Sequence, residues 1–85
     1  MYQKTIKLPN INTVYAFHKA IGSVPCDIDM MASTYKYTVD AKSLMGILSM
    51  DLTRPVILKA YTDDPEITQQ IRNVIDEIGA ENYGM

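Results

Sequence analysis

The sequence predicts one α+β domain that spans residues 1–85, with the element order β-α-β-β-α-β-α. Four segments alternate apolar and polar residues, which is typical of half-buried strands, and three others space apolar residues three or four positions apart, which is typical of amphipathic helices. A chain of 85 residues has room for a single core. We therefore expect a two-layer open-faced sandwich, in which three helices cover one face of a four-stranded antiparallel sheet.

The first strand and the first helix follow each other closely. Tyr2–Leu8 alternates apolar and polar residues, and Pro9 ends the strand because proline has no N–H group for a ladder. Asn10 and Asn12 come next, and asparagine is a favoured helix N-cap. The apolar face of the helix contains Val14, Phe17 and Ile21, with Val24 at the same spacing. The helix should end by Ser23, since a residue that precedes a proline avoids helical dihedral angles.

Two further strands form a predicted hairpin. Asp27–Ala32 and Tyr35–Asp40 both alternate apolar and polar residues. Only Ser33 and Thr34 separate them, and such a short connection favours an antiparallel hairpin. Neither residue is the glycine or asparagine that tight hairpin turns usually contain, so the sequence defines the strands better than the turn.

Ser43 is expected to start the second helix, in the segment Ser43–Met50, because a serine hydroxyl accepts a free N–H group of the first turn. The apolar residues that can line its faces are Leu44, Ile47 and Leu48 on one side and Met45 on another. Gly46 inside the helix costs about 1 kcal/mol relative to alanine. Either a close neighbour requires the missing side chain, or a short helix tolerates the glycine.

The fourth strand and the third helix complete the chain. Val56–Thr62 alternates again, and Asp63 and Asp64 followed by Pro65 form a strong helix start, which explains these carboxylates better than a catalytic pair does. The clearest amphipathic stripe follows, with Ile67, Ile71, Val74, Ile75 and Ile78. Gly79 stands where a C-terminal cap belongs, and the last six residues are expected to fray.

Composition and charge exclude several classes of function. Eight dispersed Lys and Arg residues against ten Asp and Glu give a net charge of −2, whereas nucleic-acid binding proteins usually carry a basic excess. No segment approaches the ~18 apolar residues of a membrane span, and the N-terminus lacks the apolar run of a secretory signal. We therefore expect neither a nucleic-acid partner nor a membrane association.

Reactive side chains are few in this sequence. Cys26 is the only cysteine and cannot form an intrachain disulfide, which favours a reducing compartment such as the cytoplasm. His18 is the only histidine, so the chain offers no group of histidines and cysteines for a metal ion. A core of this size also leaves little room for a substrate pocket. The sequence thus predicts no metal, no cofactor and no enzyme with its own substrate pocket.

The element order, together with the segment Asp40–Met50 (DAKSLMGILSM), resembles HPr. HPr is the small histidine-containing phosphocarrier of the bacterial phosphoenolpyruvate-dependent sugar phosphotransferase system. The resemblance covers nearly the whole chain in length and order, and its specific part is the Lys-Ser-Leu-Met-Gly motif. It implies a single HPr-like domain. In HPr, enzyme I phosphorylates a histidine at the N-terminus of the first helix, and the group passes on to sugar-specific enzyme IIA proteins.

The stretch that matches the HPr histidine differs in this chain. The family has Gly-(Ile/Leu)-His-(Ala/Thr)-Arg-Pro-Ala there, whereas Pro9–Val14 contains no histidine or arginine, and the family position falls near Asn10 or Asn12. An amide is no useful phosphoryl acceptor, so we expect no catalytic residue and no carrier activity at this position. His18, about two turns further on, is either a partly exposed helix residue or a substitute acceptor.

Ser43 matches a serine that a dedicated ATP-dependent kinase phosphorylates in HPr from many Gram-positive bacteria. From its position alone Ser43 is a structural N-cap, and the resemblance adds regulatory phosphorylation as a second interpretation. Leu44, Met45 and Leu48 match the patch with which HPr docks onto its partners. Exposed apolar residues around a polar switch are typical of a small protein interface.

Together these features favour a regulatory or binding relative of HPr in a bacterial cytoplasm, which lacks the phosphohistidine and acts through the Ser43 helix. Its expected partners are proteins of the sugar phosphotransferase system or an HPr kinase. Two alternatives stay open. One is a working phosphocarrier that uses His18 or another residue, and the other is an unrelated small α+β module that binds a protein.

Overall fold

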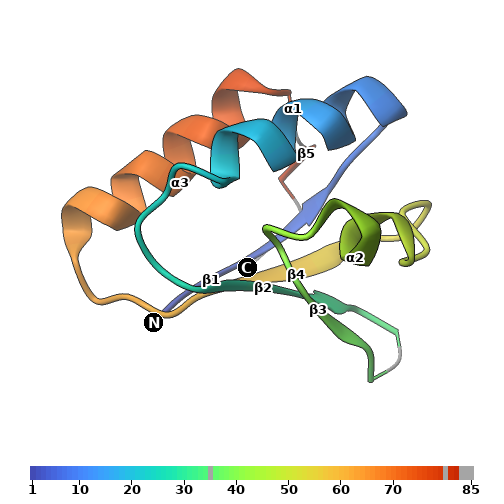
Figure 1. The fold of residues 1–85 in the computed structure, drawn as a ribbon, viewed down its shortest axis with the longest axis horizontal. Helices are drawn as coiled ribbons and strands as arrows, with labels where there is room; N and C mark the ends of the chain where they lie inside the picture. Colours follow the sequence, from blue (N-terminus) through green and yellow to red (C-terminus); the bar gives the residue numbers. More distant parts are fainter. Residues whose placement is uncertain (35, 80, 83–85) are drawn as a thin grey trace.

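The computed structural model describes residues 1–34, 36–79 and 81–82. Its elements in chain order are β1 (Tyr2–Lys7), α1 (Ile11–Ile21), β2 (Ile28–Ala32), β3 (Thr38–Asp40), α2 (Leu44–Leu48), β4 (Val56–Ala60), α3 (Pro65–Glu77) and β5 (Glu81–Asn82). Figure 1 shows α1 and α3 side by side over one face of the sheet, with α2 close to β3. The predicted element order is therefore confirmed, with one short strand added after α3.

The sheet has five strands in the order β3-β2-β4-β1-β5, and all neighbouring strands run antiparallel. The four strands predicted from the sequence form its main part, with β4 between β1 and β2. β5 adds two residues that pair with Ile6 and Lys7. The expected fraying of the C-terminus is thus wrong for residues 81–82, because they join the sheet, while residues 80 and 83–85 lie outside the described part of the chain.

The helix ends follow the predicted capping residues. Asn10 is the N-cap of α1, and its Oδ1 accepts a hydrogen bond from the Thr13 N–H group at 2.9 Å. Asn12, the other candidate, lies inside the helix. Asp64 is the N-cap of α3, and Gly79 just beyond the end of that helix has a positive φ of 77°. This left-handed conformation favours glycine and ends the helix.

The connection between β2 and β3 is longer than the predicted two-residue link. β2 ends at Ala32 and β3 begins only at Thr38. The Ala32 N–H group donates to the Tyr37 carbonyl at 2.9 Å, which closes this wider loop. A two-residue hairpin turn needs residues with positive φ, and among the described residues only Gly79 has one. Tyr35, the expected first residue of the strand, lies outside the described residues.

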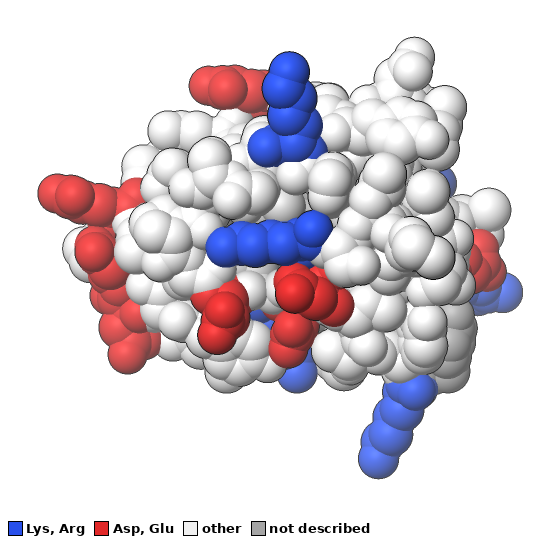
Figure 2. All heavy atoms as spheres, viewed as in Figure 1, with Lys and Arg blue, Asp and Glu red and all other residues white. Residues whose placement is uncertain are grey.

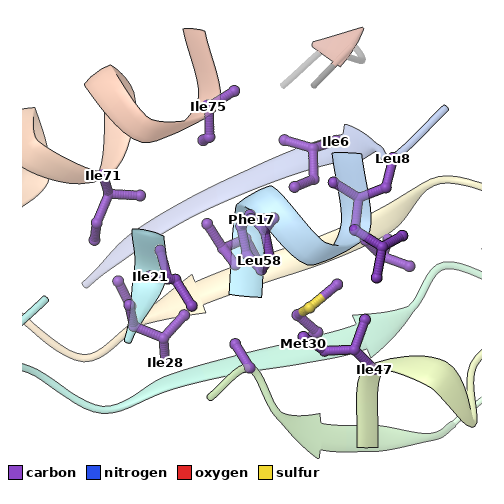
Figure 3. Packing of buried hydrophobic residues seen from close by; sticks show 14 of the residues in the cluster. Ile6, Leu8, Phe17, Ile21, Ile28, Met30, Ile47, Leu58, Ile71 and Ile75 are labelled. Atoms are coloured by element: carbon purple, nitrogen blue, oxygen red, sulfur yellow. The ribbon is translucent and has the colours of Figure 1, made fainter. Parts of the chain in front are cut away.

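The core lies between the sheet and the helices, as Figure 3 shows. The predicted apolar face of α1 is buried, since Val14, Phe17 and Ile21 each expose 2% or less of their surface. On α3, Ile71 and Ile75 are buried, while the other stripe residues pack at the edge of the core. The buried apolar residues outside these helices are Ile6, Leu8, Val24, Ile28, Met30, Ala41, Ile47, Met50, Val56, Leu58 and Ala60.

Candidate functional site

The start of α2 presents an exposed hydroxyl group. Ser43 has the extended backbone of an N-cap, and its Oγ accepts a hydrogen bond from the Gly46 N–H group at 3.1 Å. The predicted capping role of Ser43 is therefore confirmed. Its own N–H group donates to the Asp40 carbonyl at 3.0 Å, so a tight turn leads from β3 directly into α2.

The inner side of α2 packs closely on β3. A Cβ atom on Gly46 would lie 3.1 Å from the Val39 Cβ and 3.3 Å from the Ser43 Oγ, and both distances are shorter than ordinary van der Waals contacts. Ile47, the next residue, is fully buried. A new Cβ would therefore crowd Val39 and Ser43, which favours a close neighbour as the reason for the glycine.

The outer side of α2 is apolar and accessible. Met45 exposes 84% of its surface and Leu48 exposes 44%, whereas Leu44 is half-buried. The sequence grouped Leu48 with Ile47 on one face, but Ile47 belongs to the core and Leu48 does not. Of the three candidate docking residues, Met45 and Leu48 are therefore free to meet a partner, and Leu44 is only partly so.

Residues 41 and 42 anchor the turn that leads into α2. Ala41 is fully buried, and its N–H group donates to the Ile28 carbonyl of β2 at 2.9 Å. The Lys42 ammonium donates to the Val24 carbonyl at 2.6 Å. The Lys42 carbonyl in turn lies 3.2 Å from the His18 Nε2. These contacts tie the start of α2 both to the sheet and to the C-terminal end of α1.

His18 lies in the last turn of α1 and is half-buried. Because a carbonyl oxygen only accepts hydrogen bonds, the ring donates to Lys42 through a protonated Nε2. His18 lies eight positions after Asn10, which is about 12 Å along a helix axis. The histidine therefore does not stand at the helix start, where the HPr phosphohistidine is expected.

The start of α1 presents two amide side chains. Asn10 and Asn12 are both exposed, and the Asn10 Oδ1 accepts hydrogen bonds from the Thr13 N–H group and hydroxyl, at 2.9 and 3.1 Å. An open groove of about 320 Å³ lies beside this turn. Its apolar lining comes from Leu8, Pro9, Ile11, Val14 and Leu52.

Two exposed apolar side chains of α1 were not expected from the sequence. Ile11 exposes 52% of its surface and Tyr15 exposes 49%. Ile11 precedes Val14 by three positions, a spacing that predicts burial, but the groove beside it is open and leaves it accessible. Tyr15 directly follows Val14 and therefore lies outside the buried face of the helix. Its exposure could thus have been predicted from the helical spacing.

Charged side chains are unevenly distributed around this region. Figure 2 shows acidic side chains gathered over the start of α3, whereas the area over α2 and the N-terminal half of α1 is largely uncharged. The exposed apolar residues in that area are Ile11 and Tyr15 of α1 and Met45 and Leu48 of α2. A weakly charged surface with several exposed apolar side chains is suited to contact with another protein.

The acidic residues at the start of α3 and the single cysteine have structural partners. The Asp64 carboxylate accepts a hydrogen bond from the Glu66 N–H group at 2.9 Å, which confirms the predicted capping role. The hydrogen bond from the N-terminal ammonium lowers the pKa of Asp63. Cys26 is half-buried, and burial raises the pKa of its thiol, so it is a weak nucleophile.

The part of the chain that the structure describes offers neither a group of metal ligands nor a membrane-spanning helix. Across residues 1–34, 36–79 and 81–82, no three His, Cys, Asp or Glu side chains are grouped so that they could hold a metal ion. No helix in the same ranges is long and apolar enough to cross a membrane.

The fold, unlike the sequence, has a match among known proteins. No family model and no curated protein matches this sequence. Among solved structures, the chain is similar to the crystal structure of HPr-C-His from Thermoanaerobacter tengcongensis. The two share 23% sequence identity with a TM-score of 0.69, over 92% of this chain and 94% of that chain. The chain therefore has the fold of HPr.

Proposed function

We propose that this chain is a binding or regulatory relative of HPr, which acts in the bacterial cytoplasm on proteins of the sugar phosphotransferase system and carries no phosphohistidine. The observation that carries the proposal is the start of α2, where the exposed Ser43 hydroxyl stands beside the accessible side chains of Met45 and Leu48. The HPr fold and the Lys-Ser-Leu-Met-Gly motif support the assignment to this system.

The exposed apolar side chains of Met45 and Leu48 make the outer side of α2 suitable as a docking surface. Removing apolar surface from water contributes about 25 cal/mol per Å² to binding, before the entropic costs of association. The two side chains lie on a helix that the sheet supports from behind through the buried Ile47. A partner with a matching apolar hollow fits this surface, and enzyme I, an enzyme IIA protein or an HPr kinase is the class of partner that we assign to it.

Ser43 is the candidate switch on this surface. Its hydroxyl group is exposed, so a kinase can reach it. Phosphorylation would add a charge of about −1.5 to −2 at a helix N-terminus, where negative charge is favourable, so the helix would not unfold. The new charge would stand next to Met45 and Leu48, and it would change which partner can cover them.

The proposal assigns no carrier role to the start of α1. Asn10 uses its side-chain oxygen to cap the helix, and neither Asn10 nor Asn12 offers a nucleophile that could accept a phosphoryl group. The only histidine, His18, stands in the last turn of α1 with its Nε2 engaged by a backbone carbonyl. Binding and regulation therefore account for the available chemistry better than phosphoryl transfer does.

Intact-protein mass spectrometry tests this proposal in two reactions. In the first, the chain is incubated with enzyme I and phosphoenolpyruvate, and an ordinary HPr serves as the positive control. In the second, it is incubated with HPr kinase and ATP. We expect no gain in mass in the first reaction. In the second we expect a gain of one phosphoryl group, which Ser43→Ala abolishes.

Other outcomes would overturn the proposal in distinct ways. An acid-labile phosphoryl group acquired from enzyme I, and lost in His18→Ala, would favour a phosphocarrier that uses His18. No gain in either reaction, together with no binding to enzyme I or to the kinase, would favour a small protein-binding module that is unrelated to the sugar system.

A further inference from the structure

We propose that His18 is a positioning residue for α2, and that its hydrogen bond to the Lys42 carbonyl ties this helix to the C-terminal end of α1. The inference rests on the proposed function only in treating α2 as the docking element. It concerns what holds the docking surface in place.

The short helix α2 depends on its neighbours for its position. It has five residues, and isolated helices shorter than about 12 residues are marginal in water. The sheet fixes its inner side, through the buried Ile47 and the close approach of Gly46 to Val39. At its far end the Tyr37 hydroxyl lies 2.7 Å from the Ser49 Oγ. The Ala41 N–H group, which donates to the Ile28 carbonyl at 2.9 Å, holds the start of α2 to the sheet, and its attachment to α1 comes from Lys42.

Lys42 supplies this attachment through both its backbone carbonyl and its side-chain ammonium. Its carbonyl oxygen lies 3.2 Å from the His18 Nε2, and its ammonium donates to the Val24 carbonyl at 2.6 Å. Both contacts are partly buried, where a hydrogen bond competes less with water. Since His18 lies in the last turn of α1 and Val24 follows that helix closely, both bonds join the end of α1 to the residue directly before the Ser43 cap.

The imidazole is suited to this role because, opposite a carbonyl oxygen, it can only donate the hydrogen bond. The carbonyl oxygen only accepts, so Nε2 is the donor in this contact. A hydrogen bond of this kind restricts the angle between its partners as well as their distance. The His18 side chain is half-buried and bonds to the backbone of Lys42, so we assign it a role in orienting α2 and no contact with the partner itself.

Matched variants separate this role from general packing. His18→Gln keeps a side-chain N–H donor, whereas His18→Leu keeps apolar volume and removes the donor. Lys42→Met keeps the aliphatic stem and removes the ammonium. Lys19→Met makes the same change at an exposed neighbour of His18 and serves as the control.

Amide hydrogen exchange, followed by NMR on the whole chain, measures the local opening of α2. The measured quantity is the exchange rate of the Gly46 and Ile47 amides, which bond to the Ser43 side chain and carbonyl, divided by the rate of the β4 amides. We expect this ratio to rise about two- to ten-fold in His18→Leu and in Lys42→Met, the effect of one lost hydrogen bond. In His18→Gln and Lys19→Met it should stay near the wild-type value.

Three results would overturn the inference. The ratio could stay unchanged in His18→Leu, it could rise equally in His18→Gln and His18→Leu, or all amides could accelerate together. The last result would mean that the ring contributes only to global stability. If His18→Leu does not fold, His18→Met, which also keeps apolar volume and lacks an N–H donor, takes its place in the comparison with His18→Gln.

The exchange measurement needs no partner, so it separates this inference from the proposed function. If the ratio behaves as expected while the wild-type chain binds neither enzyme I nor HPr kinase, the docking role of α2 is refuted and the positioning role of His18 stands. If the wild-type chain binds a partner while the ratio does not respond to His18→Leu, the positioning role of His18 is refuted and the docking role of α2 stands.

Discussion

The starts of α1 and α2 meet the same structural need with different side chains. Asn10 and Ser43 are both exposed N-caps with extended backbones. Each side-chain oxygen accepts a hydrogen bond from the N–H group three residues later, at 2.9 Å from Thr13 and 3.1 Å from Gly46. A helix start requires only an oxygen that accepts, whereas phosphoryl chemistry requires a nucleophile. Serine offers both properties, and asparagine offers only the first.

The surroundings of the two caps differ as well. Asn10 borders an open groove and has only structural partners among its contacts. Ser43 stands beside the exposed Met45 and Leu48, and the His18 contact to Lys42 holds the turn before it. Both helix starts thus keep their caps and have exposed apolar side chains nearby, whereas the cap of α2 alone is also a hydroxyl group that can be modified.

The largest expected effect comes from a substitution on the proposed docking surface of α2. Leu48→Asp should weaken binding to enzyme I or HPr kinase by about 30-fold or more, because a charge would replace an apolar anchor at the centre of the contact. Leu48 is 44% exposed, so the variant should stay folded. Isothermal titration calorimetry measures the affinity, and circular dichroism checks the fold.

Tyr61→Ser is the control for the Leu48 experiment. Tyr61 exposes a similar 48% of its surface and directly follows β4, away from α2. This variant should bind as the wild-type chain does. An equal loss of affinity in both variants, or none in Leu48→Asp, would contradict the assignment of the docking surface to α2.

Gly46→Ala should destabilise the fold by about 1 kcal/mol. Overpacking costs about 1–3 kcal/mol, and the higher helix propensity of alanine returns about 1 kcal/mol of this. The new Cβ would stand 3.1 Å from the Val39 Cβ, which the strand backbone holds in place. Urea-induced unfolding measures the difference in the free energy of unfolding.

Gly22→Ala is the matched change at the end of α1. There the nearest atoms to a new Cβ lie at 3.5 and 3.6 Å, which are ordinary contacts, and the backbone is helical with φ −60°. Alanine should therefore stabilise the fold by about 0.5 kcal/mol. Stabilisation by Gly46→Ala as well would mean that α2 can move away from β3 at no cost.

Ser43→Asn makes the two helix starts chemically alike and should separate capping from modification. Asparagine and serine cap about equally well, so the free energy of unfolding should stay within about 0.5 kcal/mol of the wild-type value, whereas Ser43→Ala should lose about 1 kcal/mol. Phosphorylation by HPr kinase should be lost in both variants. Labelling that persists in Ser43→Asn, for example at the exposed Ser49, would place the switch elsewhere.

The features that the sequence predicts correctly depend on residues close together in the chain. Alternation within a strand, an apolar stripe along α3 and a cap such as Asp64 or Gly79 are all set within a few positions of each other. For the same reason, Asn10 and Ser43 could be recognised as caps from the sequence alone. The order of the elements follows from these local patterns together with the caps.

The features that the sequence does not predict depend on contacts between distant residues. His18 and Lys42 are 24 positions apart, and nothing in either segment indicates that they meet. The tight fit around position 46 arises from Val39 on another element. The helix α2 is too short for a period to separate the buried Ile47 from the exposed Leu48. The pairing of residues 81–82 with β1 is likewise a long-range contact.

The smallest expected effect concerns Asp51, in the turn that leads from α2 to the groove beside α1. Its Oδ1 accepts hydrogen bonds from the Thr53 hydroxyl and N–H group, and these hold the pKa of Asp51 below its ordinary value of 3.8. A carboxyl whose pKa is lowered by folding contributes stability above its unfolded pKa and loses it as the pH falls through the folded value. The turn should therefore be unchanged near neutral pH and should loosen only below about pH 4.

An NMR titration of the Asp51 carboxyl carbon and the Thr53 amide tests this expectation. Both signals should shift together with a midpoint below 3.8. Asp51→Asn keeps an oxygen that accepts from Thr53 but removes the titration, so the Thr53 signal should then stay constant in acid. A midpoint at or above 3.8 would show that the Thr53 contacts do not persist in solution. Because Thr53 also lines the groove beside Asn10, such a result would mean that this part of the groove wall is loose in solution.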